Sequence, residues 1–141
     1  MSASEKHPIL LAAAVIIKDG RVLITRRDPA PYWHLPDGDI RYGEDSLDCL
    51  RRSIGADLGL GDRDVVLEQI QPIYVSETIR RGNDRHYVTL HYRAAIVDPS
   101  RVRPRTGLVI DRLPPSSVLG LPILESTRAT LQHMGFKHLN G

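Results

Sequence analysis

The residues from Gly38 to Leu60 combine acidic side chains, arginine and glycine, which are residue types that can bind divalent cations and phosphates. Their sequence is GDIRYGEDSLDCLRRSIGADLGL. Glu44 and Arg52 are eight residues apart with Asp48 between them, so all three share one face of a predicted helix. Carboxylate oxygens are the ligands that hard divalent cations such as Mg²⁺ prefer, and such cations neutralise phosphates and activate water. This segment is therefore the first candidate for a functional site.

The segment resembles the Nudix box. The box pattern is glycine, five residues, glutamate, seven residues, Arg-Glu, an apolar residue, any residue, Glu-Glu, any residue, glycine and an apolar residue. The positions that match without a gap are Gly38, Glu44, Arg52, Ile54, Gly59 and Leu60. A strand ending in Arg26-Arg27 and the run 33–36 (WHLP) are also similar to the family's approach to the box. The resemblance covers roughly residues 8 to 136 and implies an α/β/α sandwich with a mixed sheet.

The resemblance implies an enzyme that hydrolyses a nucleoside diphosphate linked to another group. In the family, three glutamates at i, i+3 and i+4 of the box helix hold divalent ions, usually Mg²⁺. Here those positions are Ser53, Ala56 and Asp57. Ala56 offers no ligand, Ser53 offers only a hydroxyl, and the Asp57 side chain is one methylene shorter than glutamate. We therefore expect a weakened or relocated site for Mg²⁺ or Mn²⁺, with Asp57 and Ser53 as the remaining catalytic candidates.

Asp37 and Gly38 occupy the place where the family has Gly-Gly, with a backbone oxygen near the metal. The carboxylate of Asp37 is a candidate replacement ligand that would form a relocated site with Asp57. The alternative is that Asp37 only adopts a turn conformation that aspartate tolerates. In the family, the glutamate and arginine at the positions of Glu44 and Arg52 shape the loop and orient a catalytic glutamate. Since Ser53 is not an acid, we expect this pair to stabilise the loop and helix here.

Candidate substrate contacts lie outside the box. Because side chains alternate along a strand, only one of Arg26 and Arg27 should face the cleft. Tyrosines and the single tryptophan are candidates for stacking on a base, and Glu77 is the best remote candidate for a replacement base or ligand. His86 and His91 fall on opposite faces of a strand and cannot form a two-histidine metal site. The candidate contacts are Arg26, Arg27, Trp33, Tyr74 and Glu77, with Tyr42 and Tyr87 as further stacking candidates.

The elements that position these residues follow from hydrophobic periodicity. Strands are predicted at 9–17 and 21–26 around an Asp19-Gly20 turn, at 65–79 with a break at Pro72, at 86–97, and near 108–110. The 86–97 strand alternates with a period of two, which predicts one buried face. Helices are predicted at 44–58, ending at Gly59, and at 123–134, while 28–39 is a loop. A polar turn is expected around Gly82-Asn83.

Composition limits the class of protein. With 141 residues, the chain is predicted to be a single domain with a short N-terminal tail at 1–7. The single cysteine, Cys49, excludes an internal disulfide, fits a reducing cytoplasm and is expected to be a buried apolar side chain. The net charge of +2 gives little support for a nucleic-acid partner. The longest apolar run, Ile9–Ile17, is too short to span a bilayer.

Two functions fit these observations. The first is a Nudix-type hydrolase with a weakened or relocated metal site. The second is a catalytically inactive Nudix-fold module that binds a nucleotide-like small molecule. A third, minor hypothesis is metal-free chemistry that uses Glu77, His34 or Tyr42. The resemblance also implies that a homodimer is a common assembly.

Overall fold

The computed structural model describes residues 7–80, 82 and 84–139. A seven-stranded mixed sheet has the strand order β4-β6-β1-β2-β7, with β3 paired to β1 and β5 paired to β6. The strands are β1 (Ile9–Lys18), β2 (Arg21–Arg27), β3 (Asp37–Asp39), β4 (Val65–Leu67), β5 (Tyr74–Arg80), β6 (Arg85–Ile96) and β7 (Leu108–Leu113). The helices are α1 (Ser46–Leu58), α2 (Pro115–Val118) and α3 (Glu125–His133), and Pro99–Arg101 forms a 3-10 turn, η2.

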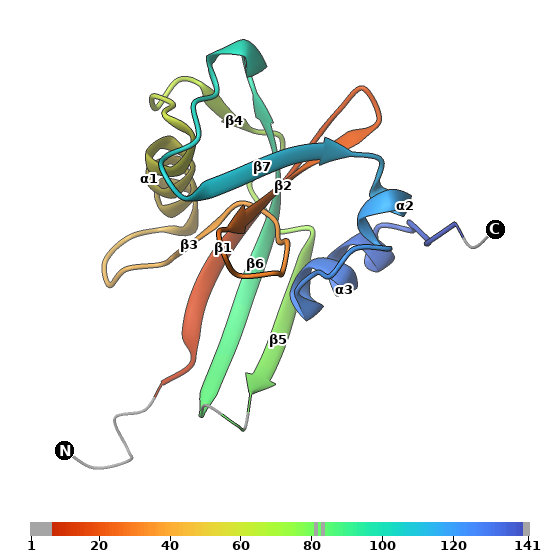
Figure 1. The fold of residues 1–141 in the computed structure, drawn as a ribbon. Coiled ribbons are helices and arrows are strands. Elements are labelled where there is room, and N and C mark those ends of the chain that lie inside the picture. The colour runs from red at the N-terminus through yellow and green to blue at the C-terminus, as the bar shows by residue number, and fades with distance from the viewer. Residues whose placement is uncertain (1–6, 81, 83, 140–141) are drawn as a thin grey trace.

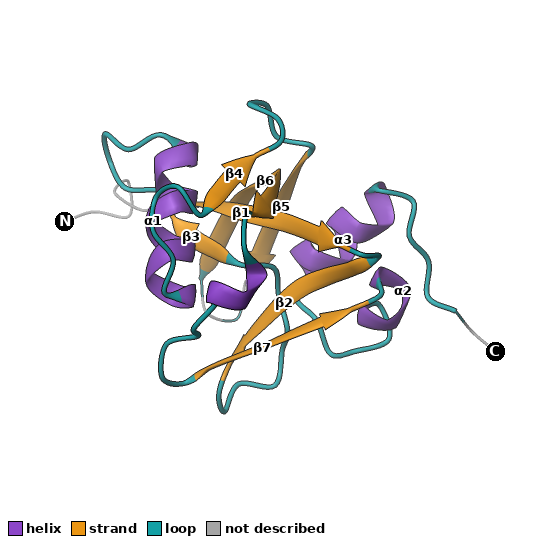
Figure 2. Ribbon diagram, turned by 90° about the horizontal axis from the view of Figure 1, so that it is seen from above, coloured by secondary structure: helices purple, strands orange, loops and turns teal. Residues whose placement is uncertain are grey.

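Helices cover the sheet from both sides, as Figures 1 and 2 show. Ala12, Ala14 and Ile16 of β1 pack with buried residues of α1 in one core, whereas Ala13 and Val15 pack with residues of α2 and α3 in a second core. Both side-chain rows of β1 are therefore buried. This arrangement confirms the predicted α/β/α sandwich with a mixed sheet. In the described part of the chain, no helix is long and apolar enough to cross a membrane.

The hairpin and the end of the box helix are confirmed. Asp19 and Gly20 both have positive φ, 53° and 74°, between β1 and β2. Gly59 adopts the left-handed conformation with φ 66°, and its N–H donates to the carbonyl of Gly55 at the end of α1. These local signals depend on backbone conformations that glycine adopts without a steric penalty.

Several predicted boundaries are wrong. The box helix begins at Ser46 instead of Glu44, because the Asp45 side chain accepts a hydrogen bond from the Asp48 N–H and caps the helix. The predicted helix 123–134 is confined to Glu125–His133, and the break between β4 and β5 is wider than Pro72 alone. The structure adds β3 inside the predicted loop and a short α2. Of the predicted 82–83 turn, Asn83 lies outside the described residues.

The prediction that β6 has one buried face is also wrong. Thr89 and His91, on the row expected to be open, are 4% and 1% exposed. The cause is the position of β6, which pairs with β1 in parallel on one edge and with β4 and β5 on the other. A strand in the middle of a sheet that is covered on both faces buries both of its rows.

Candidate functional site

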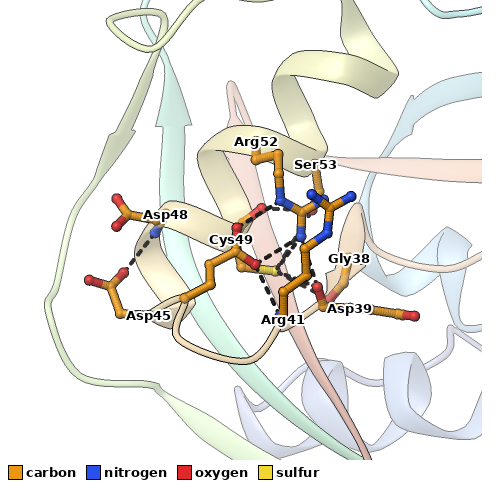
Figure 3. A network of polar contacts seen from close by, with 9 residues as sticks. Gly38, Asp39, Arg41, Asp45, Asp48, Cys49, Arg52 and Ser53 are labelled. Atoms are coloured by element: carbon orange, nitrogen blue, oxygen red, sulfur yellow. Dashed lines mark hydrogen bonds and ion pairs between the residues drawn. The ribbon is translucent and has the colours of Figure 1, made fainter.

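An ion pair joins the loop before α1 to the helix itself. Arg52 donates from Nε to Glu44 Oε2 at 2.7 Å and from Nη2 to Glu44 Oε1 at 2.9 Å. The same Nη2 donates to the Asp39 carbonyl at 2.8 Å, and the Arg41 N–H donates to Glu44 Oε1 (Figure 3). The Arg52 hydrogen bonds, followed by that of Arg41, lower the pKa of Glu44 to about 2. Glu44 reaches Arg52 from the loop and not from a shared helix face, and the pair fixes the loop against α1.

The Ser53 side chain is turned into the protein. Its hydroxyl donates to the Cys49 carbonyl at 2.6 Å, one helical turn earlier, and the residue is 7% exposed. It packs against β3, where a Cβ atom on Gly38 would overlap the Ser53 hydroxyl. Gly38 has no side chain, and this absence lets β3 approach the helix. Cys49 is buried beside them, and this burial raises the pKa of its thiol, as a structural cysteine requires.

Asp57 is paired with an arginine from a distant part of the chain. Arg105 Nε donates to Asp57 Oδ1 at 2.7 Å, and the Arg105 backbone N–H donates to the Asp57 carbonyl at 2.9 Å. The Asp57 side chain is 19% exposed. One of the carboxylates expected to hold a metal is therefore already neutralised by a guanidinium.

Asp37 lies on β3 beside His34. Its Oδ2 is 3.7 Å from His34 Nδ1. Burial raises the pKa of Asp37, and the negative charges of Asp57 and Asp39 act in the same direction, while His34 and Arg27 oppose the shift. The pKa of Asp37 is thus set by its burial and by the charged groups around it.

The residues of the box therefore do not fit a divalent metal site. The Ser53 hydroxyl donates to a backbone carbonyl, Ala56 has no side-chain atom that can bind a metal, and Asp57 is paired with Arg105. Among residues 7–80, 82 and 84–139, no group of three histidine, cysteine or acidic side chains has the arrangement to hold a metal ion. Asp37 and Asp57 are two carboxylates, which is fewer protein ligands than a well-formed cation site provides.

A cavity of about 300 Å³ lies beside β3, between β2, the β5–β6 hairpin and the start of α3. Arg27, His34, Asp37 and Arg80 are among its lining residues. Within the described residues, no ion pair or hydrogen bond of the Arg27 or Arg80 guanidinium is found. His34 Nδ1 lies 2.8 Å from the Leu35 carbonyl, which can only accept, so Nδ1 carries a hydrogen.

A second hollow of about 630 Å³ adjoins this cavity. The residues that line both are Thr78, Arg80, Leu124, Glu125 and Ser126. We call these two adjoining hollows the groove. Tyr74 and Glu77 line its second hollow and Arg27 lines its first, so these three predicted substrate contacts lie in the groove. Glu77 is 61% exposed and accepts from His86 Nε2 at 2.7 Å.

Arg26 and Trp33 do not line either hollow. The Arg26 guanidinium lies 5.2 Å from the centre of the Trp33 ring and bonds to Asp28 and the Ala30 carbonyl. Strand alternation therefore separates the two arginines as expected, with Arg27 in the groove. The sequence reasoning missed Arg80 and Glu125, which line the groove, and Arg105, which pairs with Asp57. Each comes from a segment that only the tertiary fold brings into place.

Comparisons with known proteins agree with this architecture. The NUDIX domain family matches residues 8–121 of the chain. A MutT NUDIX hydrolase from Burkholderia pseudomallei is 26% identical with a TM-score of 0.69, and the match covers 91% of this chain and 98% of that one. A NUDIX hydrolase from Nitrosomonas europaea is 19% identical (TM-score 0.72; 94% and 93% covered). The E. coli dihydroneopterin triphosphate pyrophosphohydrolase is 14% identical (TM-score 0.70; 90% and 96% covered).

Proposed function

This chain belongs to the NUDIX domain family, and we propose that it binds a nucleotide-like compound containing a diphosphate linkage without hydrolysing it. The observation that carries the proposal is the pair of guanidinium groups, Arg27 and Arg80, which line one cavity and make no ion pair within the described residues. Guanidinium groups bind phosphate oxygens through paired, charge-assisted hydrogen bonds.

The rest of the groove supports a ligand with a base or sugar. Tyr32 and Tyr74 line the second hollow and offer aromatic surface for a planar ring. Asp39 and Glu125 line the cavity and provide acceptors for hydroxyl or amino groups. The structural neighbour from E. coli is by name an enzyme acting on dihydroneopterin triphosphate, which is a compound of the same general chemistry.

The side chains of the box support the part of this proposal that excludes hydrolysis. NUDIX hydrolases generally use divalent metals. In this chain the positions at which the family places metal-binding glutamates carry an inward-facing serine, an alanine and an aspartate paired with Arg105. Losing even one outer-shell partner of a metal ligand costs about 10–100-fold in affinity or activity, and here the ligands themselves are replaced.

The experiment is a ligand panel of nucleoside diphosphates and their sugar esters, scored by thermal shift and isothermal titration in EDTA and in Mg²⁺. We expect binding that does not require metal and no product by chromatography. Arg27→Ala and Arg80→Ala should each weaken binding about tenfold or more, the cost of losing a charged hydrogen bond. Arg26→Ala is the matched control, because its guanidinium lies over Trp33 outside the groove. Failure of every compound to bind would refute the proposal.

A second candidate is the weakened hydrolase. It is favoured by one observation: the negative charge of Asp57 contributes to the raised pKa of Asp37, so the two carboxylates interact electrostatically. In that case, product should form in Mg²⁺ or Mn²⁺ and should disappear in Asp57→Ala. A homodimer is a separate proposal, which light scattering of the purified protein tests.

A further inference from the structure

Residues 103–105 form a short strap across the C-terminal end of α1. The Arg103 N–H donates to the Leu58 carbonyl at 2.7 Å, and the Arg105 N–H donates to the Asp57 carbonyl at 2.9 Å. A Cβ atom on Gly59 would lie 3.0 Å from the Arg103 carbonyl oxygen, so glycine is needed for this close approach. The strap satisfies carbonyls that a helix end leaves without partners and fixes the position of Arg105.

The Arg105 side chain is only partly used by the protein. Its Nε–H donates to Asp57 Oδ1 at 2.7 Å. In the described residues, no acceptor is found for the two Nη nitrogens, and 41% of the side chain is exposed. Asp57 therefore bonds to the Nε–H alone and leaves the four N–H groups of the two Nη nitrogens available. These N–H groups can donate to two phosphate oxygens at once.

Arg105 is also linked through the backbone to the edge of the sheet at which Arg27 lies. The Leu108 N–H donates to the Arg105 carbonyl, and Leu108 is the register partner of Arg27 at the edge of β2 and β7. Both Arg27 and Asp57 act electrostatically on Asp37, which lines the cavity. The strap thus places a guanidinium against Asp57 on α1, close along the chain to the sheet edge that carries Arg27.

We propose that Arg105 is a built-in cation that binds a phosphate group at the box helix in place of a divalent metal, with Asp57 holding its guanidinium in position. This inference deepens the proposed function, since the ligand is the same diphosphate compound. It assigns recognition of one phosphate to a residue outside the box and makes that recognition independent of metal.

The test uses inorganic pyrophosphate as the probe, titrated into the full chain in EDTA. We expect saturable binding by the wild type and a loss of about tenfold or more in Arg105→Ala, the cost of a charged hydrogen bond. Arg105→Lys keeps a point charge without the fork, so its loss should be smaller. Arg103→Ala is the matched control on the same strap, because, among the residues that the structure describes, its guanidinium bonds to the carbonyls of Ser100 and Val102 alone. Its affinity should be unchanged.

Three results would overturn the inference. They are unchanged affinity in both Arg105 variants, pyrophosphate binding that appears only when Mg²⁺ is added, and no binding by the wild type. If Arg105→Ala does not fold by circular dichroism, Arg105→Lys decides the question alone. Should nucleoside diphosphates still bind in an Arg27-dependent way, only the role of Arg105 fails and the proposed function stands.

Discussion

His91 couples the stability of this fold to pH. Its ring is 1% exposed, and burial lowers its pKa from 6.5 to about 4, against weaker opposing hydrogen bonds that the ring makes to the backbone. Between these two pH values, His91 binds a proton in the unfolded chain but not in the folded chain. Stability should fall as pH decreases from 6.5 to about 4, by on the order of 3 kcal/mol in total.

Urea unfolding across this pH range measures the effect of His91. In His91→Gln the slope should largely disappear, although the protein itself will be less stable. His86→Gln is the control, since His86 is 36% exposed on the same strand and pairs with Glu77. An unchanged slope in His91→Gln would show that another group is responsible.

Glu44 acts in a lower pH range. Its pKa is lowered from 4.5 to about 2 by Arg52, so the stabilisation is complete above 4.5 and is lost as pH falls towards 2. Glu44→Gln should lower the melting temperature at neutral pH and expose the amides of residues 39–44 to faster hydrogen exchange. Asp48→Asn is the control, because residue 48 is exposed and its backbone N–H, not its carboxylate, donates to Asp45. Equal exchange in the two variants would contradict this account.

At the scale of elements, the contact between β3 and α1 depends on the absence of a side chain at Gly38. A methyl group there would overlap the Ser53 hydroxyl. Gly38→Ala should therefore destabilise the protein by about 1–3 kcal/mol or more, the usual cost of overpacking. Ser53→Gly in the same chain should recover part of the loss in a double-mutant cycle. Additive effects in that cycle would show that the two residues do not interact.

Elements were predictable from sequence where the signal was local. The β1–β2 hairpin follows from Asp19-Gly20, and the end of α1 follows from Gly59, because positive φ is a property of single residues. The start of α1 was misplaced because the capping bond of Asp45 outweighs the helical pattern that begins at Glu44. β3 was missed because its three residues form a strand only by pairing with β1.

The candidate site was less predictable than the fold. Spacing brought Glu44 and Arg52 together correctly, yet it could not reveal that Ser53 turns inward or that Asp57 is paired. The partner of Asp57 lies 48 residues away, on a strap whose position is fixed by backbone hydrogen bonds to the end of α1. Nothing in the local sequence around Arg105 indicates this contact.

For the whole molecule, we infer that the backbone of the box is retained while the side chains that would bind a metal are missing. Ala56 is exposed on α1 next to Asp57. The double variant Ala56→Glu with Arg105→Ala adds one carboxylate and frees another, so its Mn²⁺ affinity should exceed that of Arg105→Ala alone by about tenfold or more. Isothermal titration measures both. Equal Mn²⁺ affinities of the two variants would indicate that the backbone of the box no longer supports a metal site.

The most direct test of the central claim is isothermal titration of Mn²⁺ into the wild type and Asp57→Asn. Since Asp57 is paired with Arg105 and the neighbouring positions supply no carboxylate, we expect no saturable binding below millimolar Mn²⁺ and the same trace for both proteins. Saturable binding in the micromolar range that Asp57→Asn abolishes would contradict the account, because it would show a working divalent site on the box helix.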